Sequence, residues 1–350
     1  MSGIIDLGNY KLFKQIGYGS FGHVYLTTRI GEPNKLYATK IIDINKFKSI
    51  QYINYFENEL RILRMINHKN VIRLYDCLQM NNKYYFIMEY CNGGTLLDIL
   101  KRYKAKYLRP FPQDLIQFLM RQIIEGIRYI HSLQIIHRDI KLDNILINCK
   151  DERCEFVTSE IKIIDFGLSK KLSSPNDLAI SFVGNLMNMD PIILEKYSKA
   201  GGYLKLQGYN QKADIWSLGS ICYEMLTGEN IFKAQNVIEL IKKVKQKRYS
   251  ISLNYDLSNE IISFLNSMLQ LDPNKRASAE ELLKSDFLNK NVNQFTRINT
   301  QNASYVIKDG NIIMDFNNNN SLKIQILPNY LEDLLNDYHQ VILYFDSYKL

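Results

Sequence analysis

Apolar and polar positions along the chain follow two different periods. In the first hundred residues, short apolar runs and alternating segments are typical of β-strands, whereas later stretches repeat apolar residues at helical spacing. The pattern therefore predicts a strand-rich beginning followed by long helices. The expected strands are Asn9–Ile16, Val24–Thr28, Leu36–Ile42 and Tyr84–Gly94, and the expected helices are Tyr55–Asn67, Thr95–Tyr103, Gln113–Ser132 and Ile215–Leu226.

Two apolar runs in the middle of the chain flank charged residues at fixed spacing. Asp139 is followed by Lys141 and Asn144, and a second carboxylate, Asp165, stands directly before Phe-Gly. Phosphoryl transfer needs a carboxylate that orients a hydroxyl, a cation for the γ-phosphate, and carboxylate and amide oxygens for Mg²⁺. Two polar hairpin turns are the plain structural alternative. The ordered pair of motifs favours the chemistry.

A glycine-rich stretch lies close to the N-terminus. Gly17, Gly19 and Gly22 allow a backbone to approach phosphates, and Val24 is placed to cover a base. A dinucleotide-binding fold uses a similar glycine pattern, but it requires a helix directly afterwards. Here the chain continues as a strand, so the pattern indicates a strand–loop–strand that covers a nucleotide.

Together these motifs resemble the catalytic loop, magnesium loop and glycine-rich loop of the eukaryotic serine/threonine protein kinase family. The resemblance implies an α+β, bilobal protein kinase fold with a β-rich N-lobe and a mainly helical C-lobe. It places the kinase domain at residues 10–288, with the lobes at 10–91 and 92–288. It also implies that ATP and Mg²⁺ are the cofactors. Among subgroups, the autophagy-initiating ULK-type and calmodulin-kinase-like kinases look most similar.

The same resemblance assigns roles by position. Lys40 would reach the α- and β-phosphates and pair with Glu59 on the following helix, whereas Asp139 and Lys141 would act on the acceptor and the γ-phosphate. A solvated surface Lys and a surface helix Glu are the plain alternatives for the first pair. The metal ligands would be Asn144 and Asp165. The ATP site would comprise Ile16, Gly17, Tyr18, Gly19, Ser20, Phe21, Gly22, Val24, Ala38, Lys40, Met88, Glu89, Cys91 and Leu146.

Further positions match the family in the second half of the chain. Asp214 would hold the catalytic-loop backbone, and Arg138 stands where the family binds a phosphate of the activation segment, here Leu168–Gly184 with Ser173, Ser174 and Ser181. Phe166 is expected to pack between His137 and Leu63, with Leu74 beyond. Leu168, which follows Asp-Phe-Gly, favours serine over threonine as the acceptor.

Three positions depart from the family pattern at the edge where substrates dock. Asn185, Asn188 and Ile192 replace Thr, Tyr and Glu, and residues 196–207 form an insertion. In the family, the replaced Glu pairs with the arginine that corresponds to Arg276. Because a buried unpaired guanidinium is costly, we expect a substitute carboxylate. Glu195 is the first candidate and Asp190 the second, and Arg276 turning to solvent is a third possibility.

Residues 289–350 lie outside the resemblance. Ser304–Ile307, Asn311–Phe316 and Leu322–Ile326 alternate as strands, with turns at 308–310 and 317–320, and Tyr330–Tyr344 is expected to be a helix. A small β-hairpin and helix module that docks on the kinase or a partner is one interpretation. A disordered tail is the other.

Composition narrows the remaining possibilities. The chain has 350 residues, of which 46% are hydrophobic and 23% charged, and no apolar run is long enough to span a membrane. The N-terminus shows no leader, and the five cysteines are scattered, so we expect a reducing compartment such as the cytoplasm, with the nucleus or the cytoskeleton possible. Cys149 and Cys154 resemble only half of a metal site.

The net charge of +8 includes mild basic clusters at residues 101–109 and 242–248. Solvated helix faces, or attraction to acidic substrates or anionic surfaces, would explain these clusters. Two functional hypotheses follow. The first is an active serine/threonine kinase with protein substrates, no nucleic acid and no membrane span. The second is a nucleotide-binding pseudokinase scaffold that acts through its C-terminal extension.

Overall fold

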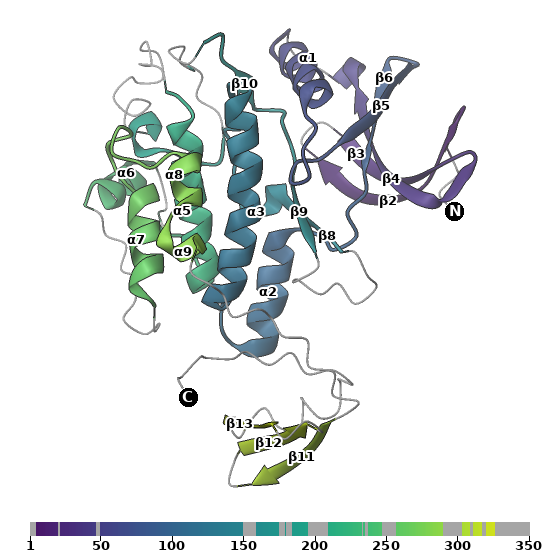
Figure 1. Cartoon of the computed structure of the whole chain (residues 1–350). Coiled ribbons are helices and arrows are strands. Elements are labelled where there is room, and N and C mark those ends of the chain that lie inside the picture. Colours follow the sequence, from purple (N-terminus) through teal and green to yellow (C-terminus); the bar gives the residue numbers. More distant parts are fainter. Residues whose placement is uncertain are drawn as a thin grey trace. The chain divides into compact units, whose positions relative to one another are not determined.

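A computed structural model of the chain describes residues 5–19, 22–46, 50–149, 159–174, 179, 184–194, 209–232, 234, 237–246, 257–289, 303–308, 311–316 and 320–325. The chain divides into two compact units, Met1–Asn289 and Lys290–Leu350. The first unit consists of a β-rich lobe followed by a mainly helical lobe (Figure 1). This is the bilobal α+β fold that the resemblance implies.

The β-rich lobe is built on one antiparallel sheet with the strand order β1-β2-β3-β4-β6-β5. Two of its strands were not expected from the sequence: β1, whose three residues give too short a pattern to recognise, and β5. The elements are β1 (Ile5–Leu7), β2 (Tyr10–Gly19), β3 (Gly22–Arg29), β4 (Glu32–Asp43), α1 (Ile50–Met65), β5 (Leu74–Met80) and β6 (Lys83–Glu89).

The sheet carries apolar residues in two separate clusters. Leu12, Tyr37 and Ile87 belong to a small cluster that β1 helps to cover, whereas Ile42 and Phe86 belong to the large core that also contains residues of α1. Helix α1 begins five residues earlier than expected, and Ile50 and Ile53 extend its apolar residues at helical spacing.

The helical lobe is organised around α3 and α5. Helix α3 has the predicted bounds, and nearly every residue of α5 is buried, so α5 forms the centre of the lobe. Helix α2 begins after its N-cap Thr95 and continues to Tyr107, four residues beyond the predicted end. The helices are α2 (Leu96–Tyr107), α3 (Gln113–Ser132), α5 (Lys212–Thr227), α6 (Val237–Lys245), α7 (Asn259–Met268), α8 (Ala279–Leu283) and α9 (Asp286–Asn289).

The two predicted apolar runs form short strands beside α3. Strand β8 (Ile145–Asn148) pairs antiparallel with β9 (Glu160–Ile163), and β7 (Ile135–Ile136) pairs with β10 (Lys170–Lys171). Residues 137–144, called the catalytic loop below, therefore run between the ends of two strands that are anchored in the core.

The second unit contains a three-stranded antiparallel sheet. Its strands are β11 (Ala303–Lys308), β12 (Asn311–Phe316) and β13 (Asn320–Gln325), in the order β11-β12-β13. The three predicted strands are confirmed, with ends that differ by one or two residues. Residues 309–310 and 317–319 of the expected turns and the helix expected at Tyr330–Tyr344 lie outside the described residues.

Cysteine chemistry differs in one place from the expectation of reduced thiols. Cys77, Cys91 and Cys222 are free, but Cys149 is disulfide-bonded. A search of the described helices found none with the length and apolarity that a membrane span requires.

Candidate active site

The catalytic loop brings Asp139, Lys141 and Asn144 together. Lys141 Nζ and Asn144 Nδ2 each lie 2.8 Å from Oδ2 of Asp139. No residue in the described part of the chain donates to Oδ1 of Asp139. One oxygen of this mostly buried carboxylate is thus fixed by two donors, and the other remains available to accept a hydrogen bond from a hydroxyl group.

Asp214 of α5 holds the backbone of this loop from below. Its two carboxylate oxygens accept the amides of His137 and Arg138, each at 2.9 Å, and His131 lies 2.9 Å from Oδ2. Burial would raise the pKa of Asp214, but the hydrogen bond and charge of His131, together with the Arg138 amide, lower it. The predicted role of Asp214 as a support for the loop is confirmed.

Lys40 and Glu59 form a buried ion pair, as the sequence predicts. Lys40 Nζ on β4 lies 2.7 Å from Glu59 Oε1 on α1. Burial alone would lower the pKa of Lys40, but the carboxylates of Glu59 and Asp165 raise it. Burial raises the pKa of Glu59 against the opposing effect of Lys40, and no donor in the described chain reaches its buried Oε2. The Lys40 ammonium therefore lies among carboxylates from two separate elements.

Asp165 and Arg138 both have left-handed backbone conformations. Their φ angles are 64° and 69°, in a region that residues other than glycine rarely adopt. Such strain persists only where the surrounding contacts fix it, and it concentrates at functional sites. Here the Asp214 bond to the Arg138 amide is one such contact.

The glycine-rich strands β2 and β3 bring the expected nucleotide residues to one end of the sheet. Gly17 pairs with Val24, and Val24 pairs with Lys40 on β4. A Cβ atom on Gly22 would lie 1.8 Å from the carbonyl oxygen of Ile41, so only glycine fits this close approach. Ile16 and Tyr18 are exposed. Ser20 and Phe21 lie outside the described residues.

The remaining expected ATP residues lie on strands that adjoin this sheet end, directly after β6, or on β8. Ala38 is buried and pairs with Met88, which directly precedes Glu89 at the end of β6. The backbone amide of Cys91 donates to no described residue, as a donor to adenine would require. Burial and the nearby Glu89 raise the pKa of the Cys91 thiol to about 12, so it is unreactive. Leu146 is half-buried on β8.

Lys162 is a residue of this region that sequence reasoning missed. Its buried ammonium group lies 2.7 Å from Glu89 Oε1, so it joins the end of β6 to β9, three residues before Asp165. A strand lysine between apolar neighbours gave no signal of a partner far along the chain. Asn58 was missed for the same reason, and it donates from α1 to the carbonyl of Ser169, 2.7 Å away.

Asn144 and Asp165 fit the donor set that Mg²⁺ prefers. The amide nitrogen of Asn144 donates to Asp139, which turns its oxygen away from that contact, and Asp165 contributes to the field around Lys40. Among the described residues, no three His, Cys, Asp or Glu side chains converge as a metal site. Magnesium usually needs only one or two protein ligands when phosphates supply the rest, so the two residues are sufficient.

The Arg138 side chain contacts the beginning of the activation segment and Tyr209. Its guanidinium donates to the carbonyls of Leu168 and Ser169 and to the hydroxyl of Tyr209. Of the serines named in the segment, Ser173 and Ser174 lie in a bend, and Ser181 falls outside the described residues. In this conformation Arg138 holds the beginning of the activation segment by donating hydrogen bonds to its backbone carbonyl groups.

Phe166 is fully buried and contacts His137. The ring centroids lie 4.9 Å apart in an edge-to-face arrangement, and His137 Nε2 lies 3.0 Å from the carbonyl of Ile164. Leu63 is buried in the same core, and Leu74 packs against it. The predicted contact with His137 is confirmed, so the residue after Asp165 anchors the magnesium loop in the core.

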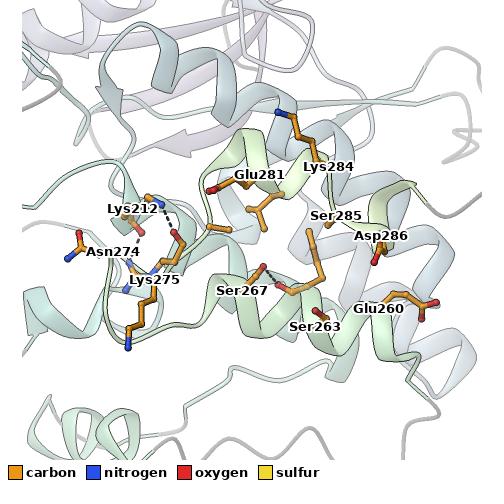
Figure 2. A pocket seen from close by; sticks show the side chains of 14 residues that line it. Lys212, Glu260, Ser263, Ser267, Asn274, Lys275, Glu281, Lys284, Ser285 and Asp286 are labelled. Atoms are coloured by element: carbon orange, nitrogen blue, oxygen red, sulfur yellow. Dashed lines mark hydrogen bonds between the residues drawn. The ribbon is translucent and has the colours of Figure 1, made fainter.

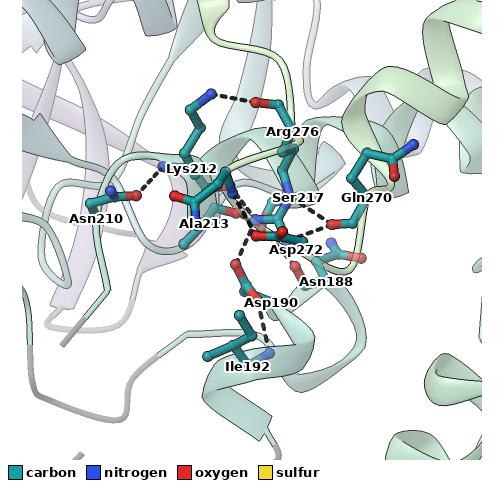
Figure 3. A network of polar contacts seen from close by, with 11 residues as sticks. Asn188, Asp190, Ile192, Asn210, Lys212, Ala213, Ser217, Gln270, Asp272 and Arg276 are labelled. Carbon is teal, nitrogen blue, oxygen red and sulfur yellow. Dashed lines mark hydrogen bonds and ion pairs between the residues drawn. The ribbon is translucent and has the colours of Figure 1, made fainter. Parts of the chain in front are cut away.

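Asp190 is the partner of Arg276, the second of the two carboxylates expected from the sequence (Figure 3). The buried Arg276 Nη1 lies 2.6 Å from Asp190 Oδ2, and the guanidinium also donates to the carbonyls of Lys212 and Gln270. The first candidate, Glu195, lies outside the described residues. Arg276 does not turn to solvent.

Asp190 reaches Arg276 because it caps a helical turn. Its Oδ1 accepts the amide of Ile192, and its carbonyl accepts the amides of Ile193 and Leu194. An N-cap residue is extended, as expected for a residue before proline. The cap leaves Oδ2 for the arginine.

A hollow with a volume of about 530 Å³ lies in the helical lobe (Figure 2). It is bordered by the beginning of α5 and by α7, α8 and α9. Apart from Arg276, whose charge is paired with Asp190, three lysines and three carboxylates line it, so it lacks the excess of positive charge that a nucleotide site needs. Its charged lining residues apart from Arg276 are Lys212, Lys275, Lys284, Glu260, Glu281 and Asp286.

Comparison with known proteins agrees with this geometry. Residues 10–288 match the family described as the protein kinase domain. The serine/threonine-protein kinase atg1 of Dictyostelium discoideum is 32% identical over 295 residues, which cover 82% of this chain and 40% of that protein. From the same organism, the "Probable serine/threonine-protein kinase MARK-A" is 31% identical over 282 residues, covering 81% of this chain and 24% of that protein. The chain thus spans less than half the length of these relatives.

Proposed function

Because the chain belongs to the protein kinase family, we propose that it is a serine/threonine protein kinase that transfers the γ-phosphate of Mg·ATP to hydroxyl groups of proteins. The likeness to atg1 agrees with the expected resemblance to the ULK-type subgroup. The observation that carries the proposal is the geometry of Asp139, which has one oxygen fixed by Lys141 and Asn144 and the other oxygen available.

Each residue has a distinct task in this proposal. Asp139 Oδ1 orients the acceptor hydroxyl and takes its proton, and Lys141 offers its ammonium group to the γ-phosphate. Lys40, held by Glu59, positions the α- and β-phosphates. A magnesium ion would rest on Asn144 and Asp165 and would neutralise the charge that develops on the phosphates. The protein contributes positioning and electrostatic stabilisation, which dominate phosphoryl transfer.

The pseudokinase alternative receives less support. Its motivation is the three departures from the family pattern, yet Asp190 replaces the missing partner of Arg276, and the Lys40–Glu59 pair is formed. The departures therefore alter the docking edge and leave the phosphate-handling residues in place. The proposed domain limits are residues 10–288 for the kinase and 289–350 for an extension whose partner is open. The proposed compartment is cytoplasmic.

The deciding experiment compares the wild type with Asp139→Asn, using Mg·ATP and a generic basic protein substrate. The variant should lose about 10²- to 10⁴-fold in kcat, the range typical of a positioned general base. Asp6→Asn is the matched control, because it makes the same chemical change at an exposed residue of β1. A wild type that binds ATP without turnover would instead support the scaffold hypothesis.

The residue after Asp-Phe-Gly gives a prediction about the acceptor. Leu168 is large and unbranched, which favours serine over threonine. Peptides that differ only in this hydroxyl residue should differ in kcat/KM, and equal values would contradict the prediction.

A further inference from the structure

The backbone of the catalytic loop is held by side chains from several distant elements. Besides the Asp214 bonds, the hydroxyl of Ser169 donates to the carbonyl of His137, 3.1 Å away. The carbonyl of Ile140, the residue directly after Asp139, accepts a hydrogen bond from Nδ2 of Asn188 at 3.4 Å. Asn188 belongs to the segment that departs from the family pattern, so this contact is a feature of this chain.

The orientation of the Asn188 amide is fixed by α5. Its Oδ1 accepts the hydroxyl of Ser220 at 2.8 Å, and its backbone carbonyl accepts the hydroxyl of Ser217 at 2.7 Å. The side chain is buried. Because the amide oxygen is used by Ser220, the amide nitrogen must point to the other side, toward Ile140. Asn188 therefore connects the central helix to the catalytic loop (Figure 3 labels Asn188 and Ser217).

The same segment touches the catalytic loop a second time. Gly184 has a φ of 113°, and a Cβ atom placed on it would lie 2.2 Å from the carbonyl oxygen of Arg138. Arg138 and Ile140 are the two chain neighbours of Asp139. The segment from Gly184 to Asn188 is therefore packed against the loop on both sides of the carboxylate.

We propose that Asn188 is a positioning residue for phosphoryl transfer: it holds the Ile140 carbonyl relative to α5 and thereby sets the position of Asp139. The inference rests on the proposed kinase activity. Misplacing a catalytic group by about 1 Å can cost 10²-fold in rate, so a single hydrogen bond next to Asp139 is enough to matter. The competing explanation is that Asn188 is an ordinary buried amide whose bonds stabilise the fold alone.

Two variants separate these explanations, because Asn188→Leu removes both side-chain bonds of the amide and Ser220→Ala removes only one of them. Asn188→Leu, which is nearly isosteric, removes the donor to Ile140. Ser220→Ala removes only the bond to Oδ1; Ser217 still holds the Asn188 carbonyl, and the amide nitrogen keeps its acceptor at Ile140. The rate of phosphoryl transfer in a single turnover should fall about 10- to 100-fold in Asn188→Leu and stay near the wild-type rate in Ser220→Ala. KM for ATP should change little in both.

The rates are measured well below the melting temperature of each variant, which is determined alongside. A rate in Asn188→Leu equal to that of Ser220→Ala would overturn the inference, even if both proteins melt earlier. If Asn188→Leu does not fold, Asn188→Asp replaces it. A protonated carboxyl can donate to Ile140 and a carboxylate cannot, so its rate relative to the wild type should fall as pH rises. A relative rate independent of pH would contradict the inference.

Failure of the proposed function gives a different result. In that case the wild type itself shows no transfer above Asp139→Asn, and no comparison between the Asn188 and Ser220 variants arises. If the wild type is active and Asn188→Leu is as active as Ser220→Ala, the kinase activity stands and the positioning role of Asn188 fails.

Discussion

At the scale of single residues, the Lys40–Glu59 pair joins the proposed phosphate-binding role of Lys40 to the stability of the fold. Both groups are buried and lie 2.7 Å apart, so neither can be removed without leaving a buried charge or forcing the other to neutralise. The raised pKa of Glu59, caused first by burial, shows which group would neutralise.

Lys40→Met should therefore lower both activity and stability. We expect a loss of about 3–5 kcal/mol in the free energy of unfolding at neutral pH, the range for breaking a buried pair. Without its cation, Glu59 should take up a proton more readily, so the stability deficit relative to wild type should shrink as pH falls. Adding Glu59→Leu should recover stability and leave kcat low. Recovery of kcat in the double variant would contradict the phosphate role of Lys40. Urea denaturation and steady-state kinetics measure the two effects.

Breaking the buried Asp190–Arg276 pair should also lower the free energy of unfolding, although neither residue belongs to the proposed catalytic site. Asp190→Asn keeps the cap on Ile192 but removes the charge opposite Arg276, so it should cost about 3 kcal/mol in the free energy of unfolding. The double variant with Arg276→Met should recover part of this loss, since no unpaired guanidinium remains buried. An Asp190→Asn variant as stable as the wild type would show that the carbonyls of Lys212 and Gln270 are enough for Arg276.

The residues of the phosphate site were predictable because each stands at a fixed distance from a recognisable motif. Asp139, Asn144 and Asp165 belong to two short patterns, and the chain folds so that these patterns come together. Asp190 could be named only as an alternative, because its direction depends on a cap that joins three backbone amides. Asn188 and Lys162 carried no local signal, since their partners are set by tertiary packing.

At the scale of elements, helix α5 carries a partly buried glutamate, Glu224, whose ionised form is disfavoured in the folded protein. Burial, and next the carboxylate of Asp143, raise the pKa of Glu224 to about 7, while Lys101 opposes the rise. The ordinary pKa of this group is 4.5. The folded protein therefore keeps the proton at pH values where the unfolded chain has lost it. The contribution of Glu224 to stability falls as pH rises from about 4.5 to 7.

Glu224→Gln should remove this dependence. At pH 8 the variant should be more stable relative to wild type than at pH 4.5, by roughly 1–3 kcal/mol. Chemical denaturation of both proteins at the two pH values measures the difference. A difference in stability that is the same at both pH values would show that Glu224 ionises normally in the folded state.

Helix and strand positions followed the apolar pattern where the pattern was long. The bounds of α3 were predicted without error, because twenty residues repeat a clear apolar face. The start of α1 and the end of α2 were missed by about a turn, and the last turns of α2 are mostly exposed and carry mixed residues. The class of each element was therefore more predictable than its ends.

At the scale of the whole molecule, the chain consists of a kinase unit and a separate C-terminal unit. The first unit has its own large core, and the family match ends one residue before the boundary at Asn289. A chain ending at Asn289 should therefore keep the melting temperature of the kinase unit and its activity toward a generic substrate. Calorimetry of the two chains is the measurement. A truncated chain that no longer folds would show that residues 290–350 complete the kinase unit.

The fold of this larger unit was predictable as a whole because its motifs occur in a fixed order. The order of Gly22, Lys40, Glu59, Asp139 and Asp165 along the chain leaves one known arrangement of strands and helices. The insertion at 196–207 and the extension have no such order, so only the composition of both and the strand alternation of the extension could be used for prediction.

The bonds from Asp214 to the catalytic loop have a consequence for hydrogen exchange. The amides of His137 and Arg138 belong to a loop, and loop amides usually exchange with solvent through small local openings. Here their acceptor is a fully buried carboxylate on the central helix. Exchange of these two amides requires that the loop separate from α5. When the protein is transferred into deuterated water, these two amides should therefore take up deuterium as slowly as the amides of the helical core.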